Sequence, residues 1–235
     1  MLAASAIPNT PPGGLMADTA IFDVDGTLVD TNYHHALAWY RAFRRYGITP
    51  AVWRIHRALG MGGDHLVGEI AGAEVEEERG DALRAAWTEE FEPMLEEIQP
   101  FEGAQELIEE VKARGFRLVL ASSGQKAHVE HFLDLVGGRK IADAWTTSDD
   151  VEATKPAPDL VGVALEKVGG DSGVMIGDSV WDAVAARKLD VPTIAVRTGG
   201  FSAEELREAG ALGVYDSLRE LHGNLDSGPL ARAHR

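Results

Sequence analysis

Asp23-Val24-Asp25-Gly26-Thr27-Leu28 directly follows a short apolar run at residues 19–22 that is typical of a buried strand. Side chains alternate between the two faces of a strand, so the carboxylates of Asp23 and Asp25 are expected to point in similar directions. Two carboxylates that lie close together repel each other unless a cation or a shared proton lies between them. A hard cation with oxygen ligands, such as Mg²⁺, meets that need. The alternative is an Asp-Gly turn that merely ends the strand.

The composition fits one large domain, or one domain with an insertion. The chain has 235 residues, of which 45% are apolar, which is enough for a hydrophobic core and argues against a disordered protein. Its formal net charge of −16 disfavours nucleic acid and anionic membranes as partners, although a local cationic pocket can still bind a small phosphorylated substrate. The chain contains no cysteine, so disulfides, zinc-thiolate sites and thiol catalysis are excluded.

The first residues carry no recognisable targeting segment. Residues 1–17 lack the charged start and long apolar centre of a secretory signal, and no stretch has the apolar length that a bilayer requires. The Pro- and Gly-rich residues 9–14 predict a flexible tail over residues 1–17, and Met16 offers an alternative start. We expect a cytoplasmic protein without a membrane partner, either a monomer or a weak dimer.

After residue 100 the chain alternates between short apolar runs and segments with helical periodicity. Strands are expected at residues 116–121, 142–147, 173–177 and 192–196 and up to Val214, and helices at residues 102–114, 125–136, 158–168, 179–189, 203–209 and 218–222. This alternation predicts an α/β fold, with a Rossmann-like core in which a mostly parallel sheet lies between helices. Such sheets carry their chemistry at the carboxyl ends of the strands.

Residues 31–99 break the alternation and are expected to be entirely helical. Two aromatic stripes at helical spacing run over residues 36–43 and 83–98, and Pro93 predicts a kink or a break in the second. We expect these stripes to pack the interior of a helical cap rather than to bind a ligand. The domain division is therefore a core at residues 18–30 and 100–235 and a cap at residues 31–99, with hinges at residues 29–32 and 98–101.

Polar residues also follow the other predicted strands. Ser122 follows the strand at residues 116–121, Lys155 precedes a proline, and Asp178 follows Gly177. Each has a simpler explanation, since Ser122 also suits a turn and Lys155 a solvated surface, although the proline restricts the backbone of Lys155 to extended conformations. Asp182 lies three residues after Ser179, which is also the spacing of a capping box.

Together these residues suit phosphoryl transfer, which requires in-line positioning and neutralisation of the phosphate charge. Asp23 is the expected nucleophile and Asp25 the expected proton donor to the leaving oxygen, which then activates water. Asp178 is expected to bind Mg²⁺ together with Asp23 and the backbone carbonyl of Asp25. Lys155 is expected to offset phosphate charge, and Ser122 to donate a hydrogen bond to it. Supporting roles are expected for four neighbours: Thr27, Ser123, Ser179 and Asp182.

These motifs resemble, in order, the four motifs of the haloacid dehalogenase superfamily, over residues 18–222. The helical insertion resembles the subfamily with a small α-helical cap, which includes phosphoglycolate phosphatases and β-phosphoglucomutases. The resemblance implies a Rossmann-like core and Mg²⁺ dependence. The dehalogenases of this superfamily lack the second aspartate, so the presence of Asp25 disfavours dehalogenation. Its phosphonatases use a cap lysine, and residues 31–99 contain no lysine.

The expected function is a Mg²⁺-dependent phosphatase that hydrolyses a small phosphorylated metabolite through an aspartyl-phosphate. A sugar-phosphate mutase of the β-phosphoglucomutase type shares the same first step and stays open. A phospho-acceptor signalling module is less favoured, because receiver domains are shorter and lack a helical insertion. A catalytically silent binding protein of this fold is disfavoured because all the expected polar groups are present.

Substrate choice is expected to lie in the cap loop at residues 53–63. Gly60 and the glycines beside it allow a bend close to the core, and Arg54 or Arg57 offers a cation for a substrate carboxylate or sugar hydroxyl. Each arginine taken alone is better explained as a surface residue. Elsewhere, His128 and His131 share a helix face and are expected to be exposed.

Overall fold

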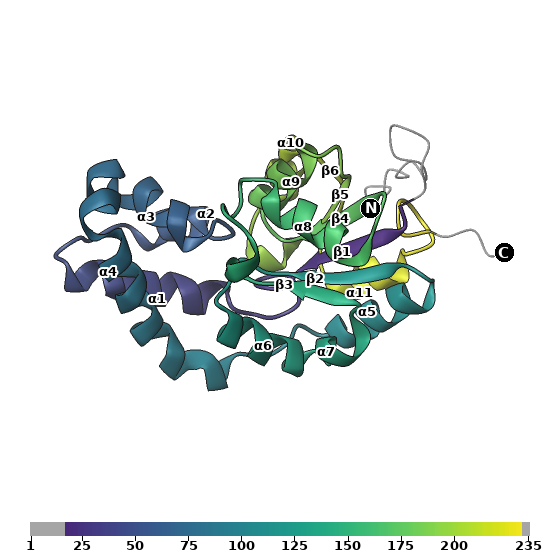
Figure 1. Ribbon diagram of the computed structural model, residues 1–235, viewed down its shortest axis with the longest axis horizontal. Coiled ribbons are helices and arrows are strands. Elements are labelled where there is room, and N and C mark those ends of the chain that lie inside the picture. Colours follow the sequence, from purple (N-terminus) through teal and green to yellow (C-terminus); the bar gives the residue numbers. More distant parts are fainter. Residues whose placement is uncertain (1–16, 232–235) are drawn as a thin grey trace.

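The structure is a computed structural model that describes residues 17–231, and it has two lobes (Figure 1). One lobe is a sheet between layers of helices, and the other contains the helices that come between β1 and α5 in the chain. The predicted α/β fold is therefore confirmed. The tail predicted for residues 1–17 lies outside the described residues except for Ala17, which is buried. Within residues 17–231, no helix combines the length and the apolar character needed to cross a bilayer.

The sheet has six parallel strands in the order β3-β2-β1-β4-β5-β6. The strands are β1 (Thr19–Asp23), β2 (Arg117–Ala121), β3 (Ala144–Thr146), β4 (Gly173–Gly177), β5 (Thr193–Val196) and β6 (Ala211–Tyr215). Asp23 pairs in register with Ala121, and Phe22 with Ile176. The carboxyl ends of β1, β2 and β4 are thus level, which brings the residues that follow these strands to one edge of the sheet.

Helices cover both faces of the sheet (Figure 1). One face carries α5 (Ala104–Ala113), α6 (Lys126–Leu135), α7 (Gly138–Ile141) and α11 (Leu218–Gly223), and the other carries α8 (Asp159–Val168), α9 (Val180–Arg187) and α10 (Ala203–Ala209). Side-chain alternation along β1 serves both layers, because Ile21 packs in the apolar cluster with α8 and α9 while Phe22 packs in the larger cluster on the opposite face. Asp23 has the same parity as Ile21 and so faces the α8 and α9 side.

Three short elements are absent from the sequence prediction: α7, η2 (Ser148–Asp150) and η3 (Arg197–Gly199). Each is too short to show a periodicity of apolar residues. The predicted strands and longer helices are present, with boundaries that differ by one or two residues where the periodic pattern fades into a cap.

The helical insertion comprises α1 (Asn32–Arg45), α2 (Val52–Ala58), α3 (Gly63–Ala71), α4 (Ala73–Phe91) and the 3-10 helix η1 (Glu92–Glu97). The predicted break at Pro93 is confirmed, since α4 ends at Phe91 and the proline lies in the first turn of η1. The predicted aromatic stripes pack against each other, and the rings of Trp39 and Trp87 stack with centroids 5.5 Å apart.

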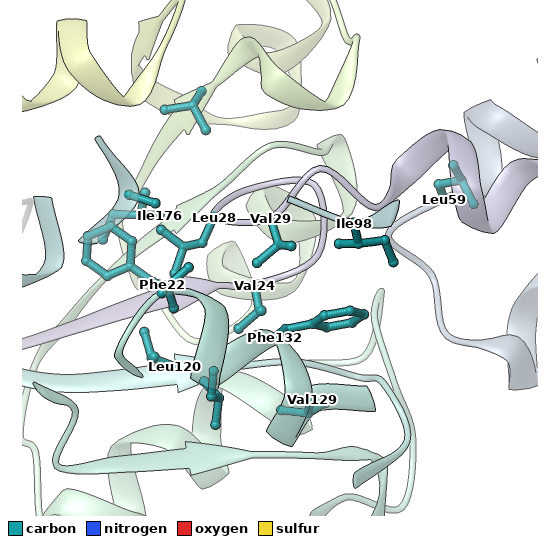
Figure 2. Packing of buried hydrophobic residues seen from close by; sticks show 14 of the residues in the cluster. Phe22, Val24, Leu28, Val29, Leu59, Ile98, Leu120, Val129, Phe132 and Ile176 are labelled. Atoms are coloured by element: carbon teal, nitrogen blue, oxygen red, sulfur yellow. The ribbon is translucent and has the colours of Figure 1, made fainter. Parts of the chain in front are cut away.

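Two linker segments connect the insertion to the core, and they run side by side. The backbone N–H of Asp30 donates to the carbonyl of Gln99, and that of Phe101 donates to the carbonyl of Leu28, each over 2.9 Å. Val29, Leu28 and Ile98 are buried in the same apolar cluster as Phe22, so the linkers are anchored in the core (Figure 2). That the linkers act as hinges, and that residues 31–99 form a separate cap domain, stay predictions.

Candidate active site

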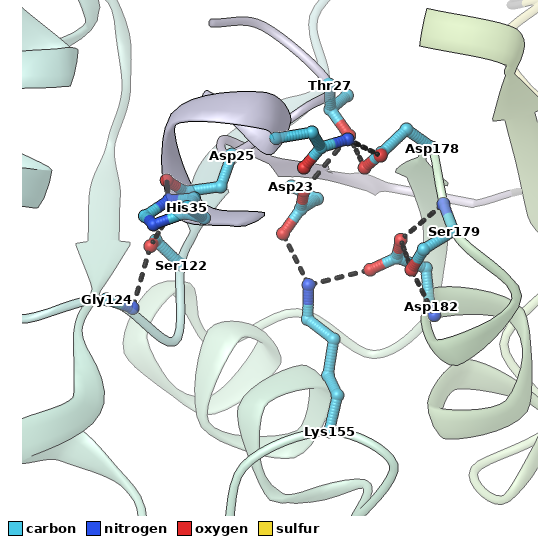
Figure 3. Close-up of polar contacts among 11 residues, drawn as sticks. Asp23, Asp25, Thr27, His35, Ser122, Gly124, Lys155, Asp178, Ser179 and Asp182 are labelled. Atoms are coloured by element: carbon cyan, nitrogen blue, oxygen red, sulfur yellow. Dashed lines mark hydrogen bonds and ion pairs between the residues drawn. The ribbon is translucent and has the colours of Figure 1, made fainter. Parts of the chain in front are cut away.

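The polar residues predicted from the strand ends meet at the carboxyl edge of the sheet (Figure 3). Asp23 ends β1, Ser122 follows β2, and Asp178 follows β4. Lys155 comes from the loop between β3 and α8, and its side chain extends to Asp23 (Figure 3). The site lies beside the border between β1 and β4, where the strand order reverses direction. This is the usual binding position in open parallel sheets.

Lys155 is buried between two carboxylates. Its Nζ donates to Asp23 Oδ1 and, over 2.7 Å, to Asp182 Oδ1. Burial alone lowers the pKa of a lysine, but the charges of Asp182 and Asp23 outweigh it and hold the pKa of Lys155 above its ordinary value, so it is a cation at neutral pH. The Lys155–Pro156 peptide bond is cis.

Asp182 has two roles that the sequence presented as alternatives. Its Oδ2 accepts hydrogen bonds from the backbone N–H and the hydroxyl of Ser179, at 3.0 and 2.6 Å, in the capping box that begins α9. Its Oδ1 accepts from Lys155. The helix cap therefore also fixes the position of the lysine.

Asp178 is held by two donors from the segment after β1. The Thr27 hydroxyl lies 2.9 Å from Asp178 Oδ1 and 3.0 Å from Asp23 Oδ2, and Asn32 Nδ2 donates to Asp178 Oδ2 over 2.9 Å. Gly26 (φ 75°) makes this approach possible, because a Cβ at that position would lie 2.5 Å from Asp178 Oδ2. Asn32, which sequence reasoning missed, is the first residue of α1.

The carboxylates of Asp23, Asp178 and Asp182 have the geometry and charge of a divalent cation site. Each offers an oxygen, and these oxygens lie within 4.8 Å of one another. All three are buried with one lysine as counter-charge, so two negative charges are left over when all are ionised. Burial raises the pKa of Asp23 well above its ordinary value, and burial followed by repulsion from Asp182 raises that of Asp178 to about 7.

Carboxylate oxygens suit a hard cation such as Mg²⁺, so the donor set fits the predicted ion. Asp182 is committed to the capping box of α9 and to Lys155, whereas Asp23 and Asp178 share the Thr27 hydroxyl and stay the predicted side-chain ligands. The backbone carbonyl of Asp25 stays a predicted third ligand.

The Asp25 carboxylate has its own partners, separate from those of Asp23 (Figure 3). Ser122 Oγ donates to its Oδ2 over 2.7 Å, and His35 Nε2 lies 3.0 Å from its Oδ1. Burial tends to raise the pKa of Asp25, but the hydrogen bond and charge of His35, with the bond from Ser122, hold the pKa below its ordinary value. The two aspartates therefore have different hydrogen-bond partners, although both line the same cavity.

Two residues near Asp25, Ser122 and His35, make contacts that the sequence analysis did not predict. Ser122 is fully buried, and its hydroxyl donates to Asp25 and accepts from the N–H of Gly124 over 2.9 Å. Ser123 lines the cavity described below. His35 was missed, because a single histidine on an expected cap helix gives no pattern that links it to a carboxylate ten residues earlier.

A cavity of about 340 Å³ lies between the core and the helical insertion. Asp23, Asp25 and Lys155 line its core end, and Trp39 and Trp87 belong to its insertion end. Gly60 (φ 93°) also lines it, and a Cβ on Gly60 would lie 2.6 Å from the hydroxyl of Ser179, so the glycine allows the cap loop to touch the core.

The two candidate arginines of the cap loop do not line this cavity. Arg54 is exposed. Arg57 forms an ion pair with Glu205 of α10, and its guanidinium carbon lies 4.3 Å from the ring centroid of Phe201. The structure thus directs Arg57 to the surface of the core, outside the cavity.

The expected exposure of the α6 histidines is wrong for His128. This residue is buried against α4, with its ring centroid 5.2 Å from Phe91 and 5.9 Å from Trp87. The sequence pattern of α6 could not show this, because the covering surface comes from the insertion. His131 is half-buried.

Comparisons with known proteins agree with this geometry. The family model of haloacid dehalogenase-like hydrolases matches residues 20–196. A phosphoglycolate phosphatase of Caulobacter vibrioides is 31% identical over 200 residues, covering 82% of this chain and 84% of that protein. A probable phosphatase, IndB, of Dickeya dadantii is 28% identical over 215 residues, covering 88% and 93%. The solved structure of a hydrolase from Pseudomonas syringae has a TM-score of 0.83 and 33% identity, covering 88% of this chain and 97% of that one.

The family expected from the motifs is therefore confirmed, as is the expected enzyme class, a hydrolase of the phosphatase type. The match covers the strand ends that carry Asp23, Ser122, Lys155 and Asp178. By sequence and by fold, the chain belongs to the haloacid dehalogenase-like hydrolase family.

Proposed function

We propose that this enzyme is a Mg²⁺-dependent phosphatase that hydrolyses a small phosphate monoester through an aspartyl-phosphate at Asp23. The observation that carries the proposal is the pair of separately held carboxylates at the core end of the cavity. Asp23 is held by Lys155 and Thr27, and Asp25 by Ser122 and His35. Two carboxylates with different partners can take different roles in one reaction.

In the first step, a carboxylate oxygen of Asp23 attacks the substrate phosphorus, and the bond from phosphorus to the leaving oxygen breaks. Lys155 orients Asp23 and offsets negative charge on the phosphoryl group. In the second step, water attacks the phosphorus of the aspartyl-phosphate, which releases inorganic phosphate and regenerates Asp23.

Asp25 moves the proton in both steps. It gives a proton to the leaving oxygen in the first step and takes one from the attacking water in the second. With its present partners the lowered pKa of Asp25 favours the ionised form that the second step requires. A phosphate dianion bound beside it raises its pKa, and so favours the protonated form that the first step requires.

Asp23 and Asp178 are the proposed side-chain ligands of Mg²⁺, with Thr27 and Asn32 orienting Asp178. When bound, the ion supplies Lewis-acid stabilisation of the phosphoryl oxygens and compensates the buried negative charge.

The proposal is tested by acid-quenching the wild-type enzyme during turnover of p-nitrophenyl phosphate with Mg²⁺. Peptide mass spectrometry is expected to find one phosphoryl group on Asp23. Phosphate release without any phosphorylated aspartate in the quenched enzyme contradicts the covalent route. Absence of phosphate release contradicts the proposed phosphatase activity. A hexose 1-phosphate serves as a second substrate, since conversion to the 6-phosphate in place of free phosphate identifies the mutase.

A further inference from the structure

The insertion end of the cavity has an apolar wall. Trp39, Leu66 and Trp87 are buried and line it, together with the half-buried Met61. These side chains come from α1, α3, α4 and the loop before α3. They come from the insertion, whereas the reacting carboxylates come from the core, so they are the apolar part of the surroundings of whatever the phosphate is attached to.

No free cation accompanies this wall among the described lining residues. Lys155 and Arg84 are the only lysine and arginine that line the described cavity. Lys155 already forms ion pairs with Asp23 and Asp182.

Arg84 is likewise neutralised by its neighbours. Its Nη1 donates to the carbonyl of Gly63 over 3.0 Å and to Glu76 over 2.8 Å, and its Nη2 donates to Asp81 over 2.8 Å. Two carboxylates against one guanidinium leave no positive charge for a ligand. An arginine in this state can touch a leaving group but gives little attraction to an anion.

The lining of the cavity also contains acidic residues, beside neutral polar ones such as Gln125 and Ser148. Asp64 accepts hydrogen bonds from the backbone N–H and the hydroxyl of Thr154, and Glu152 is exposed at the edge. A second anionic group on the substrate would therefore approach carboxylates without a cation to balance them, which is unfavourable.

We infer that the substrate is a phosphate monoester of an uncharged, largely apolar alcohol, and that the cavity rejects leaving groups that carry a carboxylate or a second phosphate. This inference rests on the proposed function, since it specifies the leaving group of the same reaction. It sets this enzyme apart from relatives whose named substrate carries a carboxylate.

The test uses an isosteric pair of substrates, 4-carbamoylbenzyl phosphate and 4-carboxybenzyl phosphate, which differ in charge and hardly in shape. With Mg²⁺ present, kcat/KM is expected to be about tenfold or more higher for the neutral ester. The kcat/KM for benzyl phosphate is expected to exceed that for 2-hydroxyethyl phosphate, because only the benzyl group is large and apolar enough to contact the apolar wall. Equal or higher kcat/KM for the carboxylated ester overturns the inference.

A variant pair tests the charge argument directly. Glu76→Gln with Asp81→Asn frees Arg84, and is expected to raise the ratio of kcat/KM for the carboxylated to the neutral ester at least about fivefold. The matched control, Glu77→Gln with Glu78→Gln, makes the same charge change on exposed positions of α4 and is expected to leave the ratio unchanged. A ratio that moves equally in both variants contradicts a role for Arg84.

Binding measurements separate this inference from the proposed function. Calorimetry with the corresponding phosphonates is expected to show tighter binding of the 4-carbamoylbenzyl compound. If no ester releases phosphate but this order of affinities holds, the proposed phosphatase activity is refuted and the inferred preference of the cavity for an uncharged leaving group stands. If the carboxylated phosphonate binds equally or more tightly, the assignment fails whatever the activity.

Discussion

The two ends of the cavity are built on different principles. At the core end, Asp23, Lys155 and Asp178 are buried and hydrogen-bonded to one another or to neighbours from the segment after β1 and the start of α1 and α9. At the insertion end, Trp39 and Trp87 present apolar rings from helices that pack mainly on one another. The reacting groups follow strand ends that are fixed by register, whereas the surroundings of the leaving group come mainly from helix surfaces of the insertion, with Asn32 and His35 of α1 as the contacts between the two ends.

The largest expected effect is at the core end. Asp23→Asn removes the nucleophile and is expected to lower kcat by at least about 1,000-fold. The fold is expected to survive, because the amide relieves repulsion from Asp178 and Asp182 although it weakens the contact with Lys155. Phosphate release and thermal melting measure the two effects, with the exposed Asp149→Asn as the matched control. Retained turnover in Asp23→Asn would remove this residue as the nucleophile.

Removal of the metal is expected to stop turnover reversibly and to make stability depend on pH. When a chelator has removed the metal, burial and, to a smaller degree, the charge of Asp182 raise the pKa of Asp178 from 3.8 to about 7. The folded protein therefore binds more protons than the unfolded chain between these values, and its free energy of unfolding falls as pH rises through this window, by on the order of 4 kcal/mol.

Mg²⁺ binds the ionised carboxylates, so it is expected to raise the melting temperature more at pH 8 than at pH 5. Melting curves in EDTA and in Mg²⁺ at both pH values test this. An equal rise at both pH values is inconsistent with an ion held by Asp23 and Asp178.

A smaller effect is expected where the insertion reaches the core end. His35→Phe keeps the ring stacked on Phe91, 4.2 Å away, but removes the nitrogen that holds Asp25. We expect kcat to fall about 10- to 100-fold with little change in KM. His35 lowers the pKa of Asp25, so its removal is expected to raise that pKa. The acidic limb of the pH–rate profile is then expected to move to higher pH.

The control for this prediction is His34→Phe, which changes the neighbouring histidine outside the cavity. His35→Gln is expected to recover part of the loss, since its amide can donate to Asp25. A fall in kcat without a shift of the profile would indicate a purely structural role for His35.

The same difference between the two ends limits what the sequence could predict. Residues 23–28 and the Gly177-Asp178 pair carry local signals, an apolar run followed by acidic and turn residues, and the parallel sheet then requires their strand ends to meet. Lys155 lies nine residues after β3, and its prediction came from the Lys-Pro pair and the order of the motifs.

The contacts of Asn32, His35, Arg84 and His128 were not predictable, because each depends on how two helices, or a helix and the core, approach in space. A helical period shows which residues share a face but not what lies opposite that face. The role of Arg57 as a substrate ligand was suggested by its charge and its loop, and neither reveals the acidic partner that α10 brings to it.

The smallest expected effect is that of Arg57→Ala. Arg57 and Glu205 are about one-third exposed, at 37% and 38%, so solvent screens their ion pair, and with the contact to Phe201 the loss of stability is expected to stay within about 1 kcal/mol. Glu205→Ala and the double variant complete a cycle that measures the pair. Since Arg57 does not line the cavity, the preference between 4-carbamoylbenzyl and 4-carboxybenzyl phosphate is expected to stay unchanged. A selective rise in KM for the carboxylated ester in Arg57→Ala would show that this arginine binds substrate, and would transfer substrate choice from the apolar wall to Arg57.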